Sequence, residues 1–83
     1  MKKETLIIKD QTINCIELED KIKSILGQYD IRSAYINFFS YGNELHARIG
    51  YFHPKKGYMQ EAKLSSSNVT DLILDLEDIL RVL

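Results

Sequence analysis

The sequence has little of what builds disulfides, zinc sites or membrane spans. Its one cysteine, Cys15, excludes a disulfide within the chain, and with two histidines it leaves too few soft ligands for a structural zinc site. The longest uninterrupted aliphatic run, Leu6-Ile7-Ile8, is far too short for a membrane span or a signal-peptide core. These absences predict a soluble, cytoplasmic protein that does not enter a membrane.

What is present suits a single small domain over residues 1–83. Hydrophobic residues make up 45% of the 83 residues, enough to bury a core. The net charge is −1, but the charges are unevenly spread. Residues 31–64 hold five basic and two acidic side chains, whereas 65–83 hold one basic and four acidic. Lysine outnumbers arginine eight to three and isoleucine is abundant, a bias common in AT-rich bacterial or phage genomes.

Two amphipathic helices follow from caps and spacing. Asn14 and Glu17 form a capping box, and Gly27 is a natural helix terminator, which predicts a first helix over 15–26. A second helix is predicted from residue 69 to the C-terminus, after the potential N-caps of 65–68. Apolar residues recur every three or four positions: Leu18, Ile22, Ile25, Leu26 and Tyr29 in the first helix, and Val69, Leu72, Ile73, Leu76, Ile79, Leu80 and Leu83 in the second.

Strand patterns occupy four segments, namely 4–9, 31–40, 45–52 and 58–64, and Gly42-Asn43 suits a tight hairpin turn. The predicted order is therefore β-α-β-β-β-α. Because each helix has one apolar stripe to bury, we expect an α+β fold. Its antiparallel three- or four-stranded sheet would carry both helices on one face.

Period-two alternation divides this sheet into two faces. The face toward the helices is predicted to carry Ala34, Ile36, Phe38, Leu45, Ala47, Ile49, Ala62 and Leu64. The opposite face is predicted to carry Ser33, Tyr35, Asn37, Phe39, His46, Arg48, Phe52, Met59, Glu61 and Lys63. A one-residue slip in register would invert the assignment of a strand.

Residues that could support catalysis are few. His46 and His53 would not converge on one metal, so we expect both to be solvent-exposed. The serines of 65–67 lack a nucleophile elbow and are interpreted as caps. The four glycines are isolated and form no phosphate-binding loop. We therefore expect no enzymatic activity and no cofactor.

Two further features have a functional and a structural interpretation. Asp71, Asp75 and Asp78 share one helical face and could hold Mg²⁺ or Ca²⁺, but a solvated helix exterior has the same pattern. Cys15 lies in the first turn of a predicted helix, where a thiol pKa can be lowered. We favour the structural interpretation of both, with no metal and with Cys15 as a small buried side chain.

The leading hypothesis is a non-catalytic protein-interaction module, such as a small adaptor or inhibitor. Small proteins of mobile elements, immunity proteins included, often act in this way. Exposed aromatic and arginine side chains are typical interface anchors, and acidic helices can imitate phosphate charge. The predicted partner-binding residues lie on the open sheet face or the acidic helix: Tyr35, Phe39, Arg48, Phe52, Lys63, Asp71, Asp75 and Asp78. A homodimer through the sheet is a further expectation.

The alternative is a protein that binds single-stranded nucleic acid on the aromatic and basic sheet face. A double-stranded-RNA-binding domain has a similar order of elements, but it needs lysines at the start of its second helix. Residues 65–71 here read Ser-Ser-Ser-Asn-Val-Thr-Asp, and the acidic helix that follows would repel a duplex. We therefore rank nucleic acid below a protein partner.

Overall fold

The computed structural model describes residues 4–83 and confirms the α+β fold. Its elements are β1 (Thr5–Ile8), β2 (Gln11–Asn14), α1 (Cys15–Gln28), β3 (Ser33–Tyr41), β4 (Glu44–Phe52), β5 (Met59–Ser66) and α2 (Val69–Arg81). The order contains one strand more than predicted, because the segment before the first helix forms two strands.

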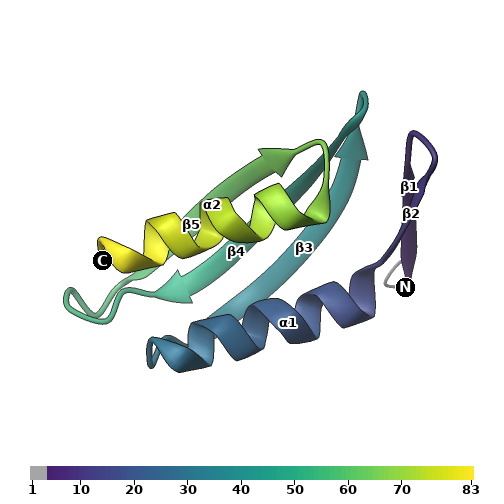
Figure 1. Cartoon of the computed structure of the whole chain (residues 1–83). Helices are drawn as coiled ribbons and strands as arrows, with labels where there is room; N and C mark the ends of the chain where they lie inside the picture. The colour runs from purple at the N-terminus through teal and green to yellow at the C-terminus, as the bar shows by residue number, and fades with distance from the viewer. Residues whose placement is uncertain (1–3) are drawn as a thin grey trace.

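The antiparallel sheet has the strand order β3-β4-β5, and both helices lie on the same side of it (Figure 1). α1 packs beside β3 and α2 packs on β5. β1 and β2 form a separate two-stranded hairpin that contacts β3 and α1. One hydrophobic core joins the hairpin, both helices and the inner face of the sheet.

The N-terminal hairpin, β1 with β2, was not predicted as a unit. Ile8 pairs with Gln11, so Lys9 and Asp10 form a two-residue turn, and Lys9 has a φ of 54°. Hairpin turns of this kind favour residues that adopt positive φ easily, such as Asn-Gly, and Lys-Asp does not give that signal. Ile13 on β2 is buried, so the short second strand contributes to the core.

α1 starts where predicted and ends later. The Asn14 side chain accepts hydrogen bonds from the backbone N–H groups of Ile16 and Glu17, at 3.0 and 3.1 Å. The prediction that Gly27 ends the helix is wrong, because the helix continues through Gln28. Asp30, at φ 57°, takes the left-handed conformation instead. The half-buried Tyr29 packs against the core, which favours the two additional helical residues.

Most of the predicted inner face is confirmed. Six of its residues are buried, namely Ile36, Leu45, Ala47, Ile49, Ala62 and Leu64, and Phe38 packs against the core from a half-buried position. The predictions that Ala34 lies on the inner face and Ser33 on the opposite face are wrong. The pairing register shifts between Ser33 and Tyr35, so Ala34 is bulged out and exposed, and Ser33 pairs with the buried Tyr51. A bulge inserts one residue and reverses the facing of the residues before it.

Candidate functional site

Most of the predicted site residues lie on the face of the sheet that is turned away from both helices (Figure 1). We call it the open face. Pairing across the strands places the following residues on it: Tyr35, Asn37, Phe39, Tyr41, Glu44, His46, Arg48, Gly50, Phe52, Met59, Glu61, Lys63 and Ser65. It therefore brings together the five predicted sheet residues Tyr35, Phe39, Arg48, Phe52 and Lys63.

An aromatic cluster occupies the end of the open face near the β3–β4 turn. The rings of Phe39 and His46 stack with centroids 5.0 Å apart and planes 10° apart. Tyr41 meets His46 edge-on at 6.0 Å. The Arg48 guanidinium carbon lies 5.6 Å from the Phe39 ring centroid, within cation–π range. Phe39 and Tyr41 remain 37% and 75% exposed, so the cluster offers apolar area to a partner.

His46 belongs to this cluster, and the prediction that it is solvent-exposed is wrong. It is half-buried, and its Nε2 atom is enclosed without a hydrogen-bond partner among the described residues. Its role in the cluster could have been found from its position opposite Phe39 across the Gly42-Asn43 turn. Tyr41 was missed because the predicted strand stopped at residue 40.

Tyr35 crosses the centre of the open face from β3 to β5. It passes over Gly50, where a Cβ atom would lie 2.2 Å from Tyr35 Cε2. The missing side chain of Gly50 therefore provides the path for the ring. The Tyr35 hydroxyl donates a hydrogen bond to the Glu61 carboxylate. This hydrogen bond raises the pKa of Tyr35, and burial and the charge of Glu61 act in the same direction.

The opposite end of the open face is a second apolar area. Phe52 on β4 pairs with Met59 on β5, and the two side chains are 44% and 53% exposed. Tyr58, 50% exposed, precedes Met59 in sequence, and Lys56 Nζ lies 5.8 Å from its ring centroid. The open face thus carries apolar side chains at both ends.

His53 is a structural residue of the β4–β5 turn, and the prediction that it is exposed is wrong. It is buried, and its Nδ1 atom accepts the backbone N–H groups of Lys55 and Lys56, both at 3.1 Å. Its backbone closes the turn through hydrogen bonds with Tyr58 and Gly57. No sequence motif indicated this use of the ring.

The charges of the open face balance. The cations Arg48 on β4 and Lys63 on β5 occupy opposite positions in the strand register. Glu44 and Glu61 carry the negative charges of the same face. The net charge of +3 counted along residues 31–64 therefore comes from Lys55 and Lys56 in the turn and Arg32 before β3. The open face itself therefore carries both positive and negative side chains.

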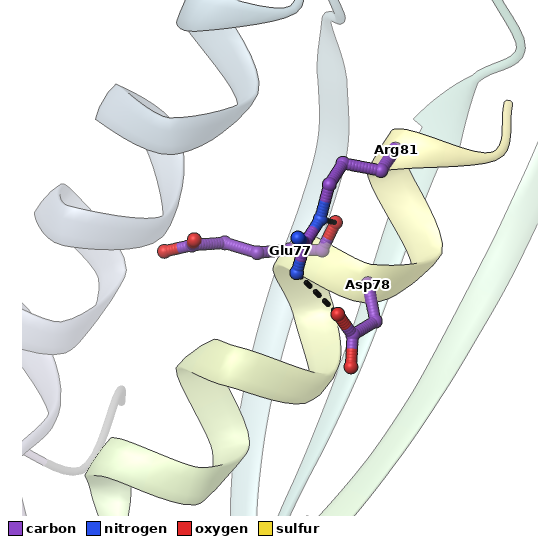
Figure 2. A network of polar contacts seen from close by, with 3 residues as sticks. All are labelled: Glu77, Asp78 and Arg81. Atoms are coloured by element: carbon purple, nitrogen blue, oxygen red, sulfur yellow. Dashed lines mark hydrogen bonds and ion pairs between the residues drawn. The ribbon is translucent and has the colours of Figure 1, made fainter.

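The predicted acidic residues form a separate surface on α2. Asp71, Asp75 and Asp78 are exposed, whereas the opposite stripe of α2 is buried on the sheet. Asp71 interacts with the N-cap, since the Asn68 side-chain amide donates to its carboxylate at 3.0 Å. Arg81 pairs with Asp78 and also donates to the Glu77 backbone carbonyl at 3.4 Å (Figure 2). Two of the three carboxylates thus have partners within the helix.

Cys15 is buried, as predicted, and burial raises the pKa of its thiol. Within residues 4–83 no group of three His, Cys, Asp or Glu side chains is placed to hold a metal ion. Neither of the helices in this range is long and apolar enough to cross a membrane.

No protein-family model, curated protein or solved structure matches the chain.

Proposed function

We propose that this protein is a non-catalytic interaction module that binds a partner protein through the open face. The observation that carries the proposal is the exposure of apolar side chains at both ends of that face, with charged side chains of both signs on the same face. As a small adaptor or inhibitor it would act in the cytoplasm. Aromatic residues, methionine and arginine are enriched at protein interfaces, and Phe39, Met59 and Arg48 are all exposed here.

The open face suits a protein partner better than single-stranded nucleic acid. Proteins that bind single strands present free aromatic faces to the bases. Here the Phe39 ring is already in contact with His46 and Arg48. Phosphate binding also favours a surface of one sign, whereas Glu44 and Glu61 offset the cations of this face. These contacts support an interface that accepts apolar groups and mixed charges.

The acidic face of α2 is the weaker candidate surface. Its exposed ion pair, Arg81 with Asp78, can be broken at little cost. Asp75 and the half-exposed Leu74 would then be its main contacts. An interface based on such groups alone lacks an aromatic anchor. We therefore place binding on the open face.

The test is affinity capture from bacterial lysate after nuclease treatment, followed by binding measurements with the recovered protein. The unchanged chain is compared with Phe39→Ser and Phe52→Ser, which remove one apolar anchor from each end of the open face. Leu74→Ser is the matched control, because Leu74 is an apolar residue on α2 whose exposure, 50%, is similar to that of Phe39 and Phe52. We expect the open-face variants to weaken binding at least about tenfold, as for aromatic residues that anchor an interface.

The pattern of losses decides between the surfaces. Loss of binding in Leu74→Ser with retention in Phe39→Ser and Phe52→Ser would place the interface on α2 and contradict the proposal. Recovery of nucleic acid alone, with binding that falls steeply as salt rises, would favour the nucleic-acid alternative. Melting temperatures of all variants serve as the folding control.

A further inference from the structure

The turn between β4 and β5 is held largely by one residue, the buried His53. Its Nδ1 atom accepts the backbone N–H groups of Lys55 and Lys56, both at 3.1 Å, and its carbonyl accepts the N–H of Gly57 at 2.9 Å. Pro54, at the first position of the turn, has no N–H group to donate. His53 therefore accepts every backbone N–H that residues 54–57 offer.

These two N–H donors determine where the His53 ring carries its proton. A ring nitrogen that accepts hydrogen bonds has no proton of its own, so the proton of the neutral ring is on Nε2. The imidazolium ion, in contrast, carries protons on both nitrogen atoms. In that form Nδ1 would be a donor facing two other donors and could accept neither. The closed turn is therefore incompatible with a protonated His53 ring.

The charged and titratable groups around His53 come from the turn and from the elements that reach this end of the sheet. In the turn, Lys56 Nζ lies 5.8 Å from the centroid of the Tyr58 ring, which meets the His53 ring edge-on at 6.3 Å. β4, the link before β3, and α2, which runs back along β5, contribute six others: Asp30, Arg32, Tyr51, Glu77, Asp78 and Arg81. Burial raises the pKa of Tyr51, so its hydroxyl stays neutral where histidine titrates. Among residues 4–83 no carboxylate forms an ion pair with His53.

We propose that the β4–β5 turn is a pH-sensitive switch, which is closed while His53 is neutral and opens when Nδ1 takes up a proton from water. Histidine is the side chain whose charge ordinarily changes between about pH 5 and pH 8. Protonation removes both hydrogen bonds from Lys55 and Lys56, and it adds a third positive charge to a turn that already holds two lysines. Opening of the turn gives the charged ring access to water.

The switch acts on one apolar end of the open face. Phe52 and Met59 are the last pair of the ladder before the turn, and the His53 N–H donates to the Tyr58 carbonyl at 2.9 Å. Opening of the turn removes a restraint that holds Phe52 opposite Met59. Regulation of binding by pH in this way rests on the proposed function, whereas the switch itself does not. The test uses the protein without a partner, so the two proposals can fail separately.

NMR spectroscopy of the ¹⁵N-labelled chain between about pH 8 and pH 5 tests the proposal. At the upper pH, the ring nitrogen signals of His53 should show Nδ1 without a proton and Nε2 with one. As the pH falls, the amide signals of Lys55 and Lys56 should shift together with the His53 ring signals. The protection of these two amides from hydrogen exchange should fall at least about tenfold. A neutral ring with its proton on Nδ1 overturns the proposal, and so do Lys55 and Lys56 amides that do not respond when His53 titrates.

His53→Asn separates the hydrogen bonds of the turn from the titration. Asn14 makes the same contacts in this chain, since its side chain accepts the N–H groups two and three residues ahead, at 3.0 and 3.1 Å. Asparagine accepts these bonds and does not titrate, so the amides of residues 55 and 56 should keep their protection at every pH.

His46→Asn is the matched control, because it removes the other histidine by the same substitution and should respond to pH as the wild type does. A pH response that persists in His53→Asn, or one that disappears in His46→Asn, would assign the effect to another group and overturn the proposal. The wild-type titration decides the outcome by itself if His53→Asn does not fold.

Discussion

β4 has two faces that are held in different ways. Its inner residues Leu45, Ala47 and Ile49 are at most 1% exposed and pack in the common core. Its outer residues contact exposed side chains of β3: His46 contacts the rings of Phe39 and Tyr41, and Arg48 lies over Phe39. Inner side chains therefore determine the free energy of unfolding, and outer ones determine the surface that the fold presents.

The largest expected difference between the two faces is in the free energy of unfolding, and it is tested at two adjacent residues of β4. Ile49→Ala should lower the free energy of unfolding by about 2–5 kcal/mol, because it removes buried methyl groups and leaves a cavity. Arg48→Ala removes an exposed cation–π contact and should cost less than about 1 kcal/mol. Urea unfolding followed by circular dichroism measures both. Equal losses would show that the outer face is as much a part of the core as the inner one.

Gly50 is an outer residue of β4 at which a substitution should nevertheless lower the stability of the fold. Gly50→Ala should cost about 1–3 kcal/mol, because the new Cβ would overlap the Tyr35 ring and displace it. In the background of Tyr35→Ala the same change should be neutral or stabilising, since alanine suits a strand better than glycine. A double-mutant cycle gives the coupling energy. Additive effects would contradict the close packing of Tyr35 on Gly50.

Much of this fold could be predicted from local patterns. The Asn14 cap, the stripe of α2 and the Gly42-Asn43 turn each have a signal within a few residues of sequence, and all three are confirmed. The alternation along β4 placed its inner residues correctly, because nothing interrupts the pairing of that strand.

What could not be predicted depends on contacts between distant residues. The bulge at Ala34 turns the Ser33 side chain to the inner face of the sheet. This bulge is visible only in the pairing of β3 with β4. The buried His53 ring accepts hydrogen bonds from two backbone N–H groups of the turn. A single histidine in a sequence carries no local signal for this role. The open-face residues could be named from alternation, but the contact of Tyr35 with Glu61 required the path over Gly50.

The smallest expected effect concerns the hydrogen bond of Tyr35 at alkaline pH. The bond to Glu61 holds the proton on the Tyr35 hydroxyl and raises its pKa above the ordinary 10.0. The stability that the bond confers is therefore complete below pH 10.0 and is lost as the pH rises through the raised pKa of the folded protein. Tyr35→Phe keeps the ring over Gly50 but removes the titrating group. Its melting temperature should consequently fall less steeply than that of the wild type as the pH rises beyond about 10.

Two controls separate this effect from other titrations. Burial also raises the pKa of Tyr51, but Tyr51 is present in both proteins, so its contribution cancels in the difference between them. Tyr41→Phe, at an exposed position on the same strand, is the control and should follow the wild type. Parallel curves for Tyr35→Phe and the wild type would mean that the bond to Glu61 does not contribute to the stability of the fold.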